Sequence, residues 1–250
     1  MQSTRRLARA FSAVVLARCL ALRVASPTLL LLVTVISLGL ARPAPAAEPE
    51  IIAGAAAVID GDTFRVGETV VRLFDVDAPE LAQTCDGGPS HLRSCGAYVA
   101  DALAERLAGQ EVRCEVLKLD QYDRRVARCE VKGEGLSEWL VASGLAMVFR
   151  RYSDRFTAEE ASAQAAGIGL WQTDFEPPWE YRAKRWEVAA QQAPDGCPIK
   201  GNINRDGERI YHTPWGSQWY DRTRISTAHG ERWFCSEREA LAAGWRPPRR

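Results

Sequence analysis

The segment Val58-Ile-Asp-Gly-Asp-Thr-Phe-Arg-Val66 continues through a Gly67 turn into Val70-Val-Arg-Leu-Phe-Asp-Val76. Its apolar residues come in short runs that alternate with polar residues, and glycines separate the runs. Period-two alternation with turn residues at the breaks is typical of strands joined by tight turns. The sequence therefore predicts a meander of strands over residues 51–74, which Pro79 ends.

Further along the chain, three segments have the spacing of helices. Residues 94–108 place Val99, Leu103 and Leu107 on one face, and a glycine follows as a stop signal. Residues 136–145 repeat apolar side chains at helical intervals, and Thr157-Ala-Glu-Glu160 has the form of a capping box. Residues 179–192 are expected to form a fourth, charged amphipathic helix.

Residues 1–47 have the pattern of an export signal. They hold six Arg and no acidic residue, and residues 28–40 form a largely apolar run before Ala44-Pro-Ala46, a typical cleavage pattern. The run is shorter than the roughly 20 residues that span a bilayer. We predict a cleaved signal peptide and a periplasmic or secreted protein with no stable membrane insertion after cleavage; an uncleaved anchor is the alternative.

The cysteines agree with export. Beyond residue 47 the chain holds an even set: Cys85, Cys95, Cys114, Cys129, Cys197 and Cys235. Oxidising compartments favour pairing. Residues 111–118 and 125–132 both alternate, so they are predicted strands joined by a turn at 119–124, with position 114 opposite position 129 and within disulfide reach. Sequential pairing is expected, with two buried thiols as the alternative for this pair.

The composition is that of a folded globular chain. It has 250 residues, of which 46% are hydrophobic and 26% charged, which excludes a fibre, a coiled coil, a polytopic membrane protein and a wholly disordered chain. The overall charge balance of 32 basic and 32 acidic residues hides a split. Residues 48–178 hold 13 basic and 23 acidic side chains, a net of −10, whereas residues 179–250 hold 13 and 9, a net of +4.

Two acidic segments carry candidate chemistry. Asp60-Gly-Asp62 supplies carboxylates at a tight turn, and Asp75-Val-Asp77-Ala-Pro-Glu80 supplies three more where a strand ends. Oxygen ligands that converge from two loops suit Ca²⁺ or Mg²⁺. Arg72 and Arg124 stand near them in the sequence, and a guanidinium is the preferred donor for a phosphate that gains negative charge. The alternative is a charge-balanced barrel surface with ordinary turns.

Five motifs in this order resemble the staphylococcal nuclease (thermonuclease) family: Val58-Ile-Asp-Gly-Asp-Thr63, Val71-Arg-Leu-Phe-Asp-Val-Asp-Ala-Pro-Glu80, Asp120-Gln-Tyr-Asp-Arg124, Gly144-Leu-Ala146 and Gly169-Leu-Trp171. The resemblance covers about residues 51–173. It implies an α+β fold in which a five-stranded OB-fold barrel carries three helices. Asp123 replaces the usual glycine of its turn, and Asp tolerates left-handed backbone geometry.

The resemblance also implies a function and the residues that perform it. The function is that of an exported Ca²⁺-dependent nuclease, which hydrolyses phosphodiester bonds of single-stranded or breathing DNA and RNA and leaves 3′-phosphates. The alternative is an inactive barrel that binds nucleic acid or protein, and a monomer is expected. The implied residues are Asp62, Asp77 and the main-chain carbonyl of Ala78 for the metal, Asp60 to support them, Glu80 to activate or orient water, Arg72 and Arg124 to clamp the phosphate, and Tyr122 to bind it.

The predicted domains are a signal peptide (1–47), a nuclease domain (51–173), a linker or helix (174–195) and a small Cys- and Trp-rich module (196–248). Motifs of this module resemble the "sunset" domain appended to some secreted nucleases. A Cys197–Cys235 disulfide is expected to staple a core of Trp215, Trp219, Trp233 and Trp245. The alternatives are a zinc site made by Cys197, His212, His229 and Cys235, and tryptophans that stack on a nucleic-acid strand.

Overall fold

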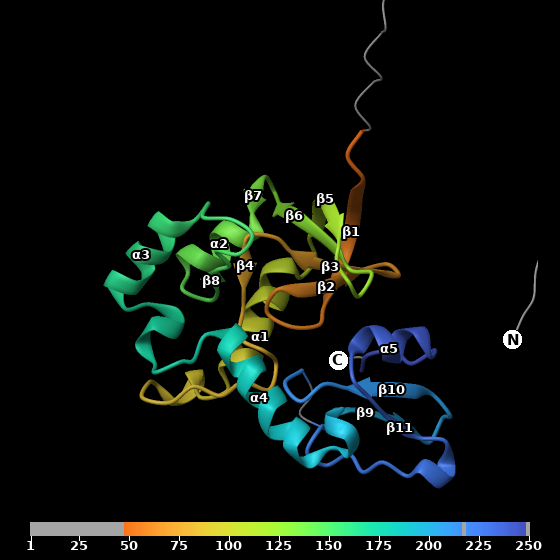
Figure 1. The fold of residues 1–250 in the computed structure, drawn as a ribbon. Coiled ribbons are helices and arrows are strands. Elements are labelled where there is room, and N and C mark those ends of the chain that lie inside the picture. Colours follow the sequence, from red (N-terminus) through yellow and green to blue (C-terminus); the bar gives the residue numbers. More distant parts are fainter. Residues whose placement is uncertain (1–47, 217–218, 249–250) are drawn as a thin grey trace, which may run out of the picture. The chain divides into compact units, whose positions relative to one another are not determined.

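The computed structural model describes residues 48–216 and 219–248 (Figure 1). The predicted signal peptide, residues 1–47, lies outside the described residues. Among those that are described, no helix combines the length and the apolar character needed to cross a membrane.

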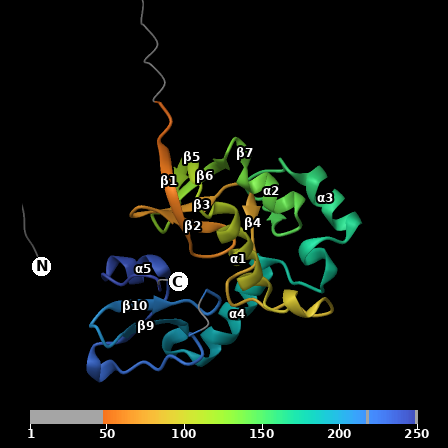
Figure 2. The same cartoon turned by 180° about the vertical axis from the view of Figure 1, so that it is seen from behind.

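The larger sheet closes into a five-stranded barrel. In the order in which they pair, its strands are β3 (Thr69–Leu73), β2 (Thr63–Val66), β1 (Ile51–Val58), β5 (Glu111–Leu119) and β6 (Arg125–Val131). All these pairings are antiparallel, and a parallel pairing of β3 with β6 joins the two ends (Figure 2). Strand β7 (Glu134–Gly135) extends this sheet beside β6, whereas β4 (Val76–Asp77) and β8 (Met147–Val148) form a separate two-stranded sheet. The predicted barrel is confirmed.

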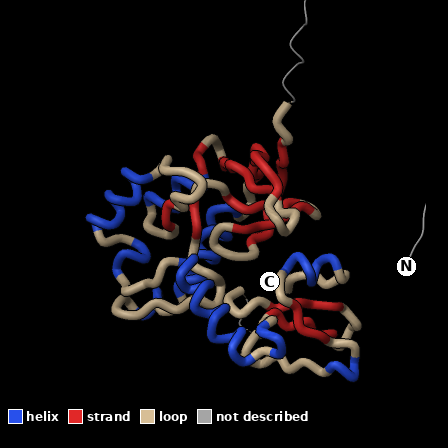
Figure 3. The backbone as a smooth tube through the Cα atoms, viewed as in Figure 1, coloured by secondary structure: helices blue, strands red, loops and turns tan. Residues whose placement is uncertain are grey.

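Helices cover one side of this barrel. They are α1 (Cys95–Leu107), α2 (Leu136–Ala142) and α3 (Thr157–Ala166), and α2 and α3 lie together in Figure 3. Helix α1 buries its predicted face of Val99, Leu103 and Leu107 in the barrel core. The predicted capping box is wrong: no side chain caps α3, because Glu160 is buried and instead accepts a hydrogen bond from the Val148 amide at 2.7 Å.

Helix α4 (Pro178–Gln192) leads to a second, three-stranded sheet. Its order is β10 (Arg209–His212), β9 (Ile199–Ile203) and β11 (Arg232–Phe234), and α5 (Glu237–Ala242) packs beside it. The predicted four-tryptophan core is wrong. Only Trp245 of the four is buried, and Trp219 is 52% exposed. Trp245 and Phe234 pack edge to face over Gly201, where the missing side chain leaves room for both rings.

Three disulfides join the cysteines in sequential pairs: Cys85–Cys95, Cys114–Cys129 and Cys197–Cys235. The predicted pairing is confirmed, and Cys114 lies opposite Cys129 in the β5–β6 ladder. The alternative of free thiols at Cys114 and Cys129 is wrong, because these two residues form a disulfide. The alternative of a zinc site in the C-terminal module is wrong because Cys197 and Cys235 also form a disulfide. Three disulfides fit an oxidising compartment outside the cytoplasm.

Candidate active site

The turn between β1 and β2 presents the first carboxylates. The Asp60 side chain accepts a hydrogen bond from the Asp62 amide at 3.1 Å, which closes the tight turn that an Asp-Gly sequence favours. Asp62 is 3% exposed, and its Oδ1 accepts from the Thr63 hydroxyl at 2.8 Å. The turn therefore fixes one buried carboxylate while its second oxygen stays free for other partners.

The second acidic segment meets this turn at the end of β4. Asp77 is fully buried, and the neighbouring Ala78 amide lies 3.5 Å from Asp62 Oδ2. Asp75, which the sequence placed in the same cluster, is not part of it. Its backbone has a φ of 76°, and its carboxylate pairs with Arg128 at 3.0 Å instead.

Arg72 joins the two carboxylates. Strand alternation turns Val71 and Leu73 into the core and Arg72 the other way, toward the acidic turn. Its Nη2 lies 2.7 Å from Asp62 Oδ2 and 2.8 Å from Asp77 Oδ1. A single guanidinium group thus bridges two predicted metal ligands that stand 15 positions apart in the sequence.

Glu80 is held by the loop that follows β4. Its amide donates to the Gln83 side chain at 3.2 Å, and the Gln83 side-chain amide donates to the Glu176 carbonyl at 2.7 Å. The Cys85–Cys95 disulfide ties the same loop to the start of α1. Glu80 is 8% exposed, so its carboxylate is fixed in a largely buried position.

Arg182 also belongs to this cluster, although no motif in the sequence points to it. It reaches in from α4, donates to both Asp77 oxygens at 3.0 and 2.7 Å, and donates to Glu80 Oε1 at 2.7 Å. It follows the resembling motifs and stands in a helix with several other charged residues, so its pattern resembles an ordinary solvated helix face. Only the contact of α4 with the loop after β4 reveals it.

Arg124 and Tyr122 come from the turn between β5 and β6. Asp120 closes this turn by accepting from the amides of Tyr122 and Arg124 at 2.8 and 3.0 Å, and it pairs with Arg124 Nε at 2.7 Å. The Arg124 guanidinium lies over the Tyr122 ring, 5.1 Å from its centroid. Asp123 adopts a φ of 60°, the left-handed geometry predicted for it.

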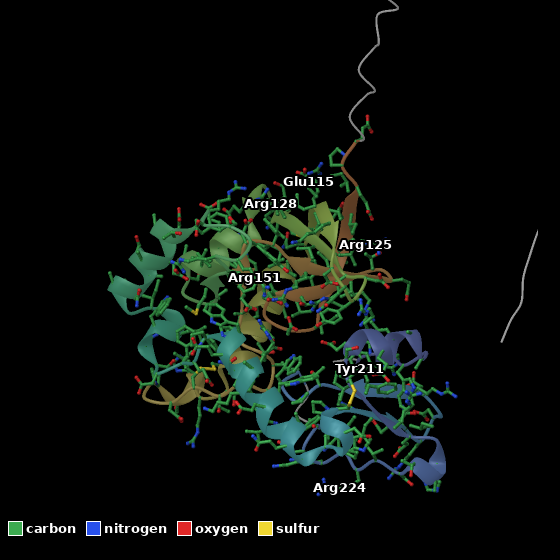
Figure 4. The ribbon with its side chains drawn as sticks, viewed as in Figure 1. Glu115, Arg125, Arg128, Arg151, Tyr211 and Arg224 are labelled. Carbon is green, nitrogen blue, oxygen red and sulfur yellow. A yellow bond between two sulfur atoms is a disulfide. The ribbon has the colours of Figure 1, made fainter. Side chains whose placement is uncertain are left out.

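Some of these residues line a cleft of about 810 Å³, but Asp62, Asp77 and Ala78 are not part of its lining. Asp60, Arg72, Glu80, Tyr122 and Arg124 line it from the barrel, and part of α4 and the C-terminal module line it as well. In Figure 4, Arg125 on β6 and Tyr211 on β10 mark the two sides. The fold thus joins the acids through guanidinium groups: Arg72 contacts Asp62 and Asp77, and Arg182 contacts Asp77 and Glu80. Arg124 and Tyr122 stand on the wall of the cleft.

Burial and mutual repulsion shape the electrostatics of the carboxylates. Burial raises the pKa of Asp60, and the charge of Glu80 raises it further, against the opposing effect of Arg72. Burial likewise raises the pKa of Asp62. It raises the pKa of Glu80 to about 7, although Arg182 acts in the opposite direction. When all four are ionised, Asp60, Asp62, Asp77 and Glu80 outnumber the guanidinium groups of Arg72 and Arg182 by two charges.

This excess of buried negative charge fits a divalent cation. The oxygens of Asp62 and Asp77 and the adjacent Ala78 carbonyl are ligands of the kind that Ca²⁺ prefers. Within residues 48–216 and 219–248, no group of three or more His, Cys, Asp and Glu side chains has the arrangement of a metal-binding set. The implied set needs only two carboxylates and a main-chain carbonyl. Arg72 bridges the two carboxylates, and the amide of Ala78 lies 3.5 Å from Asp62 Oδ2.

Family models match two regions of the chain. The model described as "Staphylococcal nuclease homologue" matches residues 70–173. The model described as "ArfC" matches residues 182–247, which begin at Arg182 and contain most of α4 and the C-terminal sheet.

Several known proteins are similar to this chain. The succinoglycan biosynthesis protein ExoI of Rhizobium meliloti is 37% identical over 138 residues, which cover 53% of this chain and 70% of that protein. The probable staphylococcal-like nuclease CAN3 of Oryza sativa subsp. japonica is 30% identical over 45% of this chain and 28% of its own length. The probable endonuclease LCL3 of Saccharomyces cerevisiae (strain RM11-1a) is 32% identical over 46% of this chain and 45% of its own length. The chain thus spans less than half of these last two relatives.

Proposed function

Because the chain belongs to the staphylococcal nuclease family, we propose that it is an exported, Ca²⁺-dependent nuclease that hydrolyses phosphodiester bonds of DNA and RNA. The observation that carries the proposal is the bridge that Arg72 makes between Asp62 and Asp77, with Glu80 buried beside them. A barrel that served only as a scaffold would have no need to hold four acids and two arginines, three of the acids buried, together beside a cleft.

The chain's own residues have distinct roles in the proposed reaction. Asp62, Asp77 and the Ala78 carbonyl would hold the cation, and Asp60 would support them. The cation, when bound, would polarise a phosphoryl oxygen and lower the pKa of water. Glu80 would accept a proton from the attacking water or orient it, a role typically worth about 10²–10⁴-fold in rate.

Arginine side chains would stabilise the transition state. Arg72 and Arg124 would donate to the phosphoryl oxygens as negative charge develops on them, and Tyr122 would bind a neighbouring phosphate. Arg124 is supported in this role by Asp120, which holds its guanidinium over the Tyr122 ring at the cleft wall. Since Arg72 already contacts both acids, it would link phosphate binding to the geometry of the cation site.

The domain organisation and location are part of the proposal. We take residues 51–173 as the nuclease domain, 174–195 as the connecting helix and 196–248 as an appended module, in a monomer that is exported by the signal in residues 1–47. The three disulfides support an oxidising compartment. Residues 48–178 carry a net charge of −10, which the arginines of the cleft and, when bound, the cation would offset where the phosphate binds.

The test is cleavage of single-stranded DNA and of RNA by the oxidised protein, with Ca²⁺ or with excess chelator. We expect both substrates to be degraded only with Ca²⁺, and Arg124→Ala to lower the rate by about 10²-fold or more. Arg113→Ala is the matched control, because Arg113 is an exposed barrel arginine whose Glu130 partner lies at 3.7 Å. A folded protein that binds strands but cuts neither with any divalent cation would favour the inactive binding barrel instead.

A further inference from the structure

One face of α4 points into the cleft. Arg182 lies on this face, because its guanidinium reaches Asp77 and Glu80. Trp186 follows four residues later, and residues at this spacing are neighbours on a helix surface, about 5–6 Å apart at Cβ. Both line the cleft together with Arg72 and Arg124. An aromatic ring therefore stands about one helical turn from the carboxylates of the proposed site.

A second aromatic ring completes this surface. The rings of Trp186 and Trp215 are 5.9 Å apart and tilted by 41°. Both side chains are half-buried, and both line the cleft. Trp186 also packs against the core of the C-terminal module. We call Trp186 and Trp215 the tryptophan pair.

Contacts of Arg185 fix the position of the tryptophan pair. Arg185, next to Trp186, donates to the Pro214 carbonyl at 2.8 Å, which holds the residue that precedes Trp215. Arg185 also pairs with Asp221 at 3.2 Å. A ring that is already immobilised loses little conformational entropy when it binds a ligand. The support from Arg185 therefore favours a ligand-binding role for the two rings.

We propose that the tryptophan pair is a stacking site for a base of single-stranded nucleic acid, next to the phosphate that Arg72 and Arg124 bind. Nucleic-acid grooves that accept single strands combine cationic groups along the backbone path with aromatic rings for the bases, and this cleft has both. A base can stack on a protein ring only after it leaves its own helical stack. The tryptophan pair therefore selects single strands, or duplex regions that open. This inference rests on the proposed function.

The experiment measures binding of a fluorescent single-stranded oligonucleotide to the full protein in excess chelator, where no cleavage is expected. Trp186→Leu and Trp215→Leu keep apolar bulk but remove the ring. We expect each to weaken binding by about 5- to 150-fold, the range of one base–aromatic stacking contact. Trp186→Phe should restore most of the affinity because it retains a stacking ring. Trp219→Leu is the control, because Trp219 belongs to the same module but does not line the cleft.

An abasic oligonucleotide of equal length separates stacking from charge. It should bind the wild-type protein more weakly than the normal strand, and it should not distinguish the wild-type protein from the Leu variants. Equal affinity of folded Leu variants and wild type for the normal strand would overturn the proposal, as would an equal loss for normal and abasic strands. If the wild-type protein binds through the tryptophan pair but never cuts the strand, the nuclease function alone is refuted. If the wild-type protein cuts the strand and the Leu variants bind it as tightly as the wild type does, the stacking site alone is refuted.

Discussion

At the scale of single residues, Arg182 and the cation should compete for the same oxygens. Arg182→Gln removes the positive charge that contacts Asp77 and Glu80, both largely buried. In chelator we expect a loss of about 2–3 kcal/mol in the free energy of unfolding, because the charge-assisted hydrogen bonds disappear. Added Ca²⁺ should restore stability more in the variant than in the wild type, and should bind the variant more tightly, because a repelling cation is gone.

Thermal unfolding with and without Ca²⁺, together with a calcium titration by calorimetry, measures both effects. Lys184→Gln is the matched control, since Lys184 stands on the same helix and is largely exposed. Weaker Ca²⁺ binding by the Arg182 variant would mean that Arg182 supports the cation site instead of competing for it.

A glycine in α1 should control the position of Glu80. A Cβ atom on Gly96 would collide with the Glu80 main-chain carbonyl, which is backbone and cannot turn aside. Gly96→Ala should therefore cost about 1–3 kcal/mol of stability. It should also lower the cleavage rate by up to about 10²-fold, the effect of a 1 Å misplacement. Urea unfolding and initial rates measure the two losses. Glu105→Ala, exposed on the same helix, should change neither, and full activity of Gly96→Ala would mean that Glu80 has no critical position.

At the scale of elements, the β5–β6 hairpin depends on its disulfide. Cys114 and Cys129 are opposite each other in the ladder and close a loop with a sequence separation of 15. Replacing both with Ala should lower the free energy of unfolding by about 3 kcal/mol, because the unfolded chain regains the entropy of the open loop. Urea denaturation of the oxidised proteins measures the change. Glu111→Ala, exposed on the same strand, is the control, and an unaltered urea midpoint in the double variant would contradict the prediction.

For the whole molecule, the buried carboxylate of Glu80 should make the free energy of unfolding decrease as the pH rises. Burial raises the pKa of Glu80 from 4.5 to about 7, so between these values the folded protein without metal holds a proton that the unfolded chain has lost. The contribution of Glu80 to the free energy of unfolding is therefore fully present below pH 4.5 and is lost as the pH rises to 7. His212 acts in the opposite sense, since burial lowers its pKa to about 4.

Comparison with Glu80→Gln isolates this contribution. In chelator, the free energy of unfolding of the wild type minus that of the variant should fall as the pH rises from about 4.5 to 7. Urea denaturation at several pH values in this window measures the difference. A difference that does not change with pH would show that Glu80 keeps its ordinary pKa in the folded protein.

Much of the barrel could be predicted from the sequence, because its strands and turns are determined locally. Alternation in residues 111–118 and 125–132 set the hairpin register and, with it, the Cys114–Cys129 pair. The core of the C-terminal module could not be predicted, because nothing local distinguishes a buried tryptophan from an exposed one. Trp245 is buried over Gly201 by a contact across 44 positions, while Trp219 is exposed.

In the site, too, the residues of local motifs could be predicted and those placed by tertiary packing could not. Asp62, Asp77 and Arg72 were predicted to act together because each belongs to a short motif, and they do lie together. Asp75 stands in the same motif but turns away, since its backbone has a positive φ that the sequence did not reveal. Arg182 could not be assigned, because its role depends on how α4 packs against a loop about 100 residues earlier.

The proposed chemistry of the carboxylate site is tested by the initial rate of single-stranded DNA cleavage as a function of Ca²⁺ concentration, for the wild type and Glu80→Gln. We predict a rate that rises with Ca²⁺ and saturates in the wild type, and is about 10²–10⁴-fold lower in the variant at saturation. The variant should still bind the strand. Cleavage by the wild type in excess chelator, or equal rates of the two proteins at saturating Ca²⁺, would contradict the proposed chemistry of the carboxylate site.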